Sequence, residues 1–371
     1  MEHKYNKGEW SEFYAFIKIL GDRELAASDE KLNAIPNLTY PVTKLIQKDL
    51  QTTREYNLSS KENLVITTMD SEGRNVTTAN YEDIKSKTKT IFTDLKQATG
   101  RSFVLVSADS LIGELNFGKI KAGASKKGDI VIVLHDHITS QDHEVEFSIK
   151  SYLGGQPTLL NPSKIGTNFK FKVVGFSGDV ESINSIDSNR KVLDRFEAIR
   201  TAGGELEFAG MLSSTFQKNI RKIDSFMPEI VGEYLRLANK GRGKKISDLT
   251  KLVFNSPPIA ALLEPSLDHE DIKYKIKQLL LNVALGMVPQ TEWDGLFKAD
   301  GGYIVVREDG EVVCFHVYNI SQLSEYLFQN TTLETPSTSR YNFASLYQES
   351  NSLYINLNLQ IRFIKPLKTS D

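Results

Sequence analysis

Residues 129–150 constrain the fold more than any other stretch of the chain. Asp129 precedes the run Ile-Val-Ile-Val-Leu at 130–134, which is short and entirely apolar and therefore predicts a buried central strand. A polar connection follows at 135–142. The next residues alternate strictly, with Glu144, Glu146, Ser148 and Lys150 on one face and Val145, Phe147 and Ile149 on the other. A period of two is that of a β-strand, so the segment predicts two antiparallel strands joined by a turn.

Helical and strand patterns alternate along the rest of the chain. Residues 9–20 repeat apolar side chains at three- and four-residue spacing, which predicts an amphipathic helix. Further helices are predicted at 81–99, 191–201, 227–239, 269–285 and 321–329, with a loop at 158–163 and strands at 303–307, 311–317 and 353–363. We therefore expect a mixed α/β fold with a central mixed sheet flanked by helices. Three segments are expected: 1–188, a helical region at 189–295, and a β-rich part at 296–371.

Composition excludes several classes of protein. The 45 Lys and Arg against 47 Asp and Glu give a net charge of −2, which argues against a nonspecific, histone-like nucleic-acid binder, although 119–127, 240–245 and 362–368 are locally basic. The single cysteine, Cys314, excludes an intramolecular disulfide and a Cys-based zinc site. No stretch approaches the roughly 18 apolar residues of a membrane helix, and the N-terminus lacks the apolar region of a signal peptide. A cytoplasmic protein without a membrane partner is expected.

Acidic and basic side chains around the two predicted strands suggest phosphodiester chemistry. Asp129 opens the first strand, Lys150 ends the second, and the first helix carries Glu9 and Glu12. Hydrolysis of a phosphodiester needs a divalent cation, and Mg²⁺ takes oxygen ligands from two or three converging carboxylates. Glu146 lies on the same strand face as Lys150, so it is a further candidate ligand.

Two other sites are weighed against this one. Ser148 and Lys150 share a strand face as a serine–lysine hydrolase dyad would, but no oxyanion-hole motif accompanies them. His135, His137 and His143 form a histidine cluster that makes zinc an alternative ligand, yet they lie around a predicted hairpin connection, where an exposed polar turn is favoured.

Five segments resemble the HpaII family of type II restriction endonucleases. They are Asn-Lys-Gly-Glu-Trp-Ser-Glu at 6–12, Phe-Ser-Ile-Lys-Ser-Tyr-Leu-Gly at 147–154, Pro-Thr-Leu-Leu-Asn at 157–161, Thr-Pro-Ser-Thr-Ser-Arg at 335–340 and Leu-Asn-Leu-Gln-Ile-Arg-Phe at 357–363. The resemblance implies a Mg²⁺-dependent endonuclease that cuts CCGG in double-stranded DNA. It also implies a restriction-endonuclease-like core in 1–188 and a cognate DNA methyltransferase as genetic partner. A palindromic site favours a homodimer.

The resemblance also implies roles for individual residues. Nucleases of this fold carry an acid two positions before the lysine, where this chain has Ser148, so another acid must complete the metal site. Asp129 is expected as a metal ligand and Lys150 as the catalytic lysine; Glu146, Glu12 and Glu9 are the candidate replacement acids. Candidate DNA contacts are Arg340, Gln156, Asn161, Arg242 and Lys244. Because Ser148 departs from the pattern, a non-cleaving DNA-binding protein with a nuclease-like fold remains the alternative.

Overall fold

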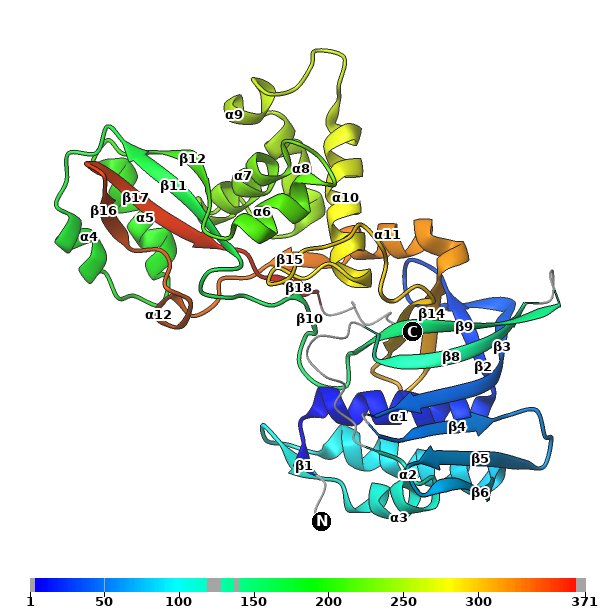
Figure 1. Ribbon diagram of the computed structural model, residues 1–371. Helices are drawn as coiled ribbons and strands as arrows, with labels where there is room; N and C mark the ends of the chain where they lie inside the picture. The colour runs from blue at the N-terminus through cyan, green and yellow to red at the C-terminus, as the bar shows by residue number, and fades with distance from the viewer. Residues whose placement is uncertain (1–3, 50, 119–127, 137–139, 365–371) are drawn as a thin grey trace, which may run out of the picture. The chain divides into compact units, whose positions relative to one another are not determined.

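The computed structural model describes residues 4–49, 51–118, 128–136 and 140–364, and the chain forms two compact units (Figure 1). Unit 1 comprises Met1–Pro157 and Phe297–Tyr326, and unit 2 comprises Thr158–Leu296 and Leu327–Asp371. Each unit combines helices and strands, which confirms the mixed α/β class. The expected assignment of separate roles to 1–188, 189–295 and 296–371 stays a prediction.

Unit 1 is built on a mixed sheet whose nine strands, within the described residues, run in the order β2-β14-β13-β9-β8-β3-β4-β5-β6. The β9–β13 and β2–β14 pairs are parallel and the other pairs are antiparallel. The strands are β2 (Glu24–Ser28), β3 (Ala34–Lys48), β4 (Thr53–Asn57), β5 (Asn63–Asp70), β6 (Gly73–Asn80), β8 (Ile130–Asp136), β9 (Gln141–Ser151), β13 (Gly302–Val306) and β14 (Val312–His316), with β1 (Lys4–Tyr5) pairing β7 (Phe103–Val104) separately. The helices are α1 (Lys7–Asp22), α2 (Tyr81–Gln97), α3 (Val106–Glu114) and the 3₁₀ turn η1 (Val317–Asn319).

Helix α1 packs on this sheet as its sequence predicts. Its stripe of Trp10, Phe13, Ile17 and Leu20 is fully buried. These side chains belong to the same core as Ile132, Phe147 and Ile149, which lie on β8 and β9. The two predicted strands are confirmed as an antiparallel pair in which Val131 lies opposite Glu146. The packing fixes how α1 is rotated, and hence where its acidic residues lie relative to β9.

Unit 2 contains two smaller antiparallel sheets and most of the helices. The first sheet runs β12-β11-β17-β16 and the second β10-β18-β15 among the described residues. The strands are β10 (Thr158–Leu160), β11 (Asn168–Val174), β12 (Glu205–Met211), β15 (Thr331–Leu333), β16 (Leu346–Glu349), β17 (Ser352–Asn358) and β18 (Ile361–Phe363). The helices are α4 (Val180–Ser185), α5 (Lys191–Thr201), α6 (Ser214–Arg221), α7 (Met227–Asn239), α8 (Ile246–Phe254), α9 (Pro257–Ala260), α10 (His269–Leu285) and α12 (Thr338–Tyr341); α11 (Ile320–Gln329) begins in unit 1 and ends in unit 2.

The helices predicted at 191–201, 227–239 and 269–285 are confirmed, whereas one loop prediction and one strand prediction are wrong. Residues 158–160 form the strand β10 rather than a loop, because β18 supplies a partner that the local sequence cannot reveal. The single strand predicted at 353–363 is two strands in different sheets, since β17 pairs with β11 and β18 with β10 and β15.

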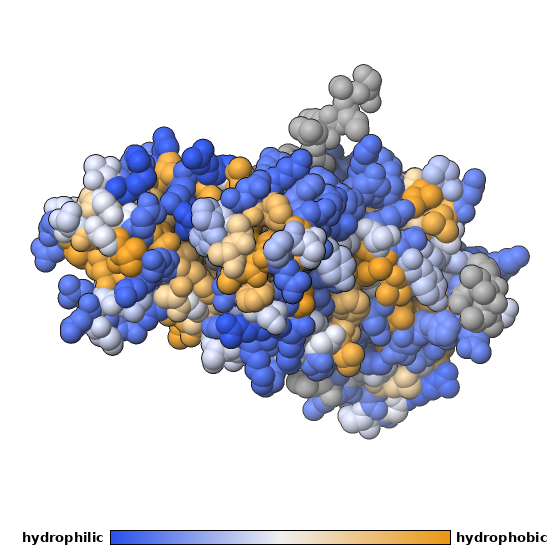
Figure 2. All heavy atoms as spheres, turned by 90° about the horizontal axis from the view of Figure 1, so that it is seen from above, coloured by the Kyte–Doolittle hydropathy of each residue, from blue (hydrophilic) through white to orange (hydrophobic). Residues whose placement is uncertain are grey.

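On the face shown in Figure 2, hydrophilic residues surround apolar residues that gather in small groups. No helix in the described ranges is long and apolar enough to cross a membrane.

Candidate active site

Helix α1 brings two acidic residues to the edge of the site, and one of them closes the start of the helix. The backbone N–H of Asn6 donates to Glu9 Oε2 at 2.8 Å, and the side-chain Oδ1 of Asn6 accepts from the backbone N–H of Glu9 at 3.0 Å. This reciprocal pair is a capping box, which satisfies backbone donors that a helix start leaves free. Glu9 therefore has a structural role at the helix start, while Glu12 lies one turn further along α1.

Asp129 is held against β9 by its backbone and by its carboxylate. Its backbone N–H donates to the Phe147 carbonyl at 2.8 Å. Its Oδ2 accepts from the backbone N–H of Ile149 at 2.6 Å and from the hydroxyl of Ser148 at 3.2 Å. Ser148 is only 2% exposed, so its hydroxyl is a fixed donor rather than a solvated one. Ser148 thus orients the carboxylate of Asp129.

Lys150 lies at the end of the same strand and is half-buried. Its Nζ donates to the carbonyl of Ile149 at 3.1 Å. Among the described residues it forms no salt bridge, so its ammonium group keeps donors free for another partner. Asp129, just before β8, is therefore bonded to the part of β9 that ends at Lys150, as the sequence predicts for the hairpin.

The charges of Asp129 and Lys150 both act on the carboxyl group of Glu12. The pKa of Glu12 is raised to about 8. Burial is the main cause, the negative charges of Asp129 and Glu9 add to the increase, and the positive charge of Lys150 opposes it. Such influences require proximity, because electrostatic interactions in a protein weaken with distance. The structure thus brings Glu12, Asp129 and Lys150 together from α1, from the residue before β8, and from β9.

The donor chemistry at this place fits a divalent cation. Two carboxylates that repel each other, here Glu12 and Asp129, gain from a cation between them. Mg²⁺ keeps several waters and is commonly bound through one or two carboxylates, so two are sufficient. Within the described part of the chain, no group of three or more His, Cys, Asp or Glu side chains is arranged to hold a metal.

Glu146 lies beside the residue that precedes Asp129. Its carboxylate is packed so closely against Gly128 that a Cβ there would collide with Glu146 Oε2. Its backbone N–H donates to Asp300 Oδ1 at 2.8 Å. Glycine at 128 is therefore what allows the chain to enter β8 past the Glu146 side chain.

The candidate DNA-contacting residues are exposed, and they are distributed over both units. Gln156 belongs to unit 1, whereas Asn161, Arg242, Lys244 and Arg340 belong to unit 2. The guanidinium of Arg340, on the short helix α12, lies over the ring of Tyr341 at 5.3 Å from its centroid.

The loop at 240–245 lies alongside the motif at 335–340. Lys244 Nζ donates to Thr335 Oγ1 at 3.1 Å, and the Lys244 carbonyl accepts from the backbone N–H of Leu333 at 2.8 Å. The structure thus joins two segments that sequence analysis selected separately.

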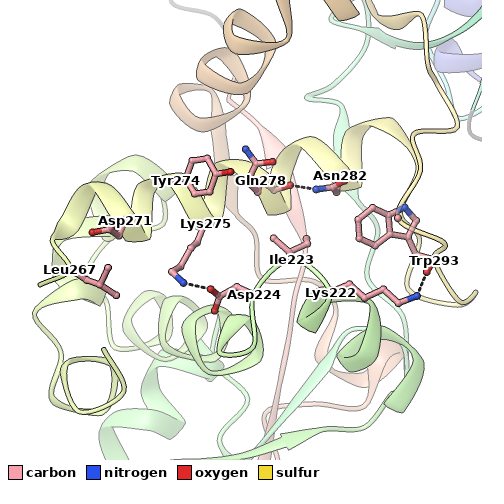
Figure 3. Close-up of a pocket in the computed structure, with 11 residues that line it drawn as sticks. Lys222, Ile223, Asp224, Leu267, Asp271, Tyr274, Lys275, Gln278, Asn282 and Trp293 are labelled. Atoms are coloured by element: carbon pink, nitrogen blue, oxygen red, sulfur yellow. Dashed lines mark hydrogen bonds and ion pairs between the residues drawn. The ribbon is translucent and has the colours of Figure 1, made fainter. Parts of the chain in front are cut away.

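The histidine cluster and a pocket in unit 2 are built from other residues. His135 Nδ1 lies 2.8 Å from Asp142 Oδ1 across the β8–β9 hairpin, and this bond lowers the pKa of Asp142. His137 and the basic stretch 119–127 lie outside the described residues. In unit 2, residues of α10 and the turn after α6 line a pocket (Figure 3) in which Lys275 pairs with Asp224 and Lys222 donates to the Trp293 carbonyl. The ammonium groups of Lys222 and Lys275 are therefore already bonded to other residues of this protein.

Sequence analysis missed three tyrosines near the site. Tyr303 lies beside Ser148 in the parallel β9–β13 pair and is fully buried. Burial, together with the charges of Tyr152 and Asp129, raises the pKa of its hydroxyl well above the usual value. The hydroxyls of Tyr152 and Tyr326 meet at 2.7 Å. No local pattern indicates that residue 303 pairs with residue 148.

The chain resembles known restriction enzymes over nearly its whole length. The sequence pattern of the HpaII restriction endonuclease family matches residues 6–363. The type II restriction enzyme HpaII of Haemophilus parainfluenzae is 36% identical over 361 residues, which cover 97% of this chain and 98% of that enzyme. No solved structure matches the chain.

Proposed function

Because the chain belongs to the HpaII family and is a type II restriction enzyme, we propose that it hydrolyses double-stranded DNA at CCGG with Mg²⁺ as cofactor. The observation that carries the proposal is the meeting of Glu12, Asp129 and Lys150, two carboxylates and a lysine from three elements of unit 1. Carboxylates beside a lysine are the groups that metal-assisted phosphodiester hydrolysis requires.

Asp129 and Glu12 are the residues that would hold Mg²⁺. When bound, such a cation stabilises negative charge on the phosphate and lowers the pKa of a bound water. The chain's own part in binding is to fix Asp129 through the Ile149 N–H and the Ser148 hydroxyl, so that the carboxylate does not have to be ordered on binding. In the free protein, the Glu12 carboxyl retains its proton up to about pH 8.

Lys150 acts on the attacking water. Its Nζ is anchored at one side by the Ile149 carbonyl and has further N–H groups with which to orient that water by donating hydrogen bonds to its oxygen. Glu12 is the acid that we assign in place of the carboxylate missing at Ser148. Glu9 closes the helix start, and Glu146, beside Gly128, is proposed as an additional ligand.

We assign DNA recognition to the exposed residues in both units. Arg340 is proposed to contact guanine, because a guanidinium can bond both O6 and N7 of that base. Arg242, Lys244, Gln156 and Asn161 are proposed to contact the duplex. CCGG is palindromic, which favours a twofold dimer in the cytoplasm, and a cognate methyltransferase would protect the host's own sites.

A plasmid digest tests the function directly. Wild-type protein with Mg²⁺ should convert a plasmid that carries CCGG into discrete fragments, whereas a plasmid without the site, or a reaction in EDTA, should remain uncut. Lys150→Ala should lower the cleavage rate about 10²- to 10⁴-fold and leave DNA affinity in Ca²⁺ nearly unchanged. Lys61→Ala, on an exposed turn of the same unit, is the matched control and should cut normally.

The outcomes separate the proposal from its alternative. Asp129→Asn should lose cleavage and regain part of it at high Mg²⁺ or in Mn²⁺, because it removes one ligand charge. Binding to CCGG without cleavage in any divalent metal would favour a non-cleaving DNA-binding protein. Cleavage by Lys150→Ala at nearly the wild-type rate would overturn the assignment of β9 as the catalytic strand.

A further inference from the structure

We propose that a row of side chains across the three-stranded sheet of unit 2 binds the phosphate backbone of DNA, with Arg362 at its centre. The row consists of Thr158, Arg362, Thr332 and Lys245. The inference rests on the proposed function, since it takes DNA to be the substrate, and it adds a binding site that lies apart from Glu12, Asp129 and Lys150.

The register of the sheet builds the row. Strand β18 lies between β10 and β15, so that Arg362 is opposite Thr158 on one side and Thr332 on the other. An antiparallel bridge places Lys245 opposite Thr332. Directly opposed residues in antiparallel strands point to the same face of a sheet. With strands about 4.8 Å apart, the Cα atoms of Arg362 and Lys245 are about 10 Å apart.

The opposite face of the same sheet is apolar. Leu160, Ile361 and Leu333 lie there and are 4%, 1% and 3% exposed. Helix α8 packs against β15, and α10 packs against β10. Leu160, Ile361 and Leu333 are therefore part of the buried interior, whereas Thr158, Arg362 and Thr332 on the other face are only partly buried.

Arg362 has no partner among the described residues. Its Nε is shielded from solvent and makes no hydrogen bond, and the guanidinium forms no salt bridge there. Arg195 in the same unit shows the contrast, because its guanidinium bonds to the carbonyls of Asn184, Ile186 and Ala344 and to the Ser345 hydroxyl. A shielded donor without a partner costs folding free energy. Such a cost is explained when a ligand supplies the missing acceptor.

The chemistry of the row selects an anion. A guanidinium is planar and offers paired donors that match two oxygens of a phosphate. Threonine hydroxyls on both sides add neutral donors, and Lys245 adds a second positive charge whose nearest acid, Asp248, is 4.0 Å away and 69% exposed. No carboxylate belongs to the row. In a restriction enzyme the matching anion is the DNA backbone, and contacts to it position the protein without reading sequence.

Salt dependence of DNA binding tests the proposal. Affinities of wild-type protein and of Arg362→Gln are measured in Ca²⁺, at 50 to 200 mM salt, on a CCGG duplex and on a scrambled duplex. Loss of one phosphate contact should reduce the slope of log K against log salt by about 0.9 on both duplexes, so the loss of affinity across this range becomes about 3.5-fold smaller. Lys245→Gln should act in the same way. Arg200→Ala, which removes an exposed arginine paired with Glu197 on α5, should leave the slope unchanged.

A stability measurement separates binding from a structural role. Because Arg362 has no partner among the residues that the structure describes, Arg362→Gln should unfold at the wild-type temperature or above it in the absence of DNA. A lower unfolding temperature, or failure to fold, would overturn the proposal, since it would show that Arg362 holds the sheet. An unchanged salt slope, or an affinity loss confined to CCGG, would also overturn it. If wild-type protein neither binds nor cuts DNA, the proposed function itself fails.

Discussion

Replacing Glu12 by glutamine should stabilise the metal-free protein at alkaline pH and have little effect in acid. In the folded protein the pKa of Glu12 is raised to about 8, mainly by burial, whereas the ordinary value is 4.5. Between these two values the folded state holds a proton that the unfolded chain has lost. The free energy of unfolding therefore falls as pH rises through this window, and the loss is complete above about pH 8.

The size of the effect follows from the two pKa values. Each pH unit in the window corresponds to about 1.4 kcal/mol. The wild-type protein thus loses about 0.4 kcal/mol by pH 4.5 and about 4.6 kcal/mol by pH 8.5, and glutamine, which cannot ionise, avoids both losses. Relative to wild type, Glu12→Gln should gain about 4 kcal/mol between these two pH values. Water that reaches the half-buried carboxylate reduces this gain, so the figure is an upper limit.

Urea unfolding in EDTA at pH 4.5 and 8.5 measures the difference. The chain has two tryptophans, Trp10 on α1 and Trp293 in unit 2, so a Trp293→Phe background makes Trp10 fluorescence report on unit 1 alone. Glu82→Gln, whose side chain is 82% exposed at the start of α2, is the matched control and should change stability little at either pH. An equal stability change for Glu12→Gln at both pH values would refute the reasoning.

Three further changes address other parts of the protein. Glu146→Gln should slow cleavage at limiting Mg²⁺ more than it weakens DNA binding, and unchanged cleavage would remove Glu146 from the site. Arg340→Ala should cost about 1 to 3 kcal/mol of discrimination between CCGG and other sites, measured by competition binding, whereas an equal loss on random DNA would assign Arg340 to phosphate. Cys314 is fully buried, and burial raises the pKa of its thiol. The thiol should therefore react with a thiol reagent only when unit 1 unfolds, and prompt labelling of the native protein would contradict this.

The sequence by itself determined the local elements and the hairpin that carries Asp129 and Lys150. The apolar stripe of α1 and the alternation of β9 follow from the periods of a helix and a strand, and such periods are properties of neighbouring residues. Asp129 and Lys150 are only 21 positions apart, so an antiparallel pair with a short turn is enough to bring them together.

Only the tertiary structure decided which further side chains lie close to Asp129 and Lys150. Sequence analysis left Glu9, Glu12 and Glu146 as alternatives, and the packing of α1 against β9 is what places Glu12 near Asp129 and Lys150. The parallel pairing that puts Tyr303 beside Ser148 likewise joins residues far apart along the chain.

Pairing between distant strands also explains why the sequence alone did not reveal the row around Arg362. Residues 158, 245, 332 and 362 come from four distant parts of the sequence, and none of them carries a local signal for the others. A strand's hydrophobic pattern specifies which face is buried, but not which strand becomes its neighbour. That choice depends on how the remaining elements pack around the apolar faces, so it is made only when the whole unit folds.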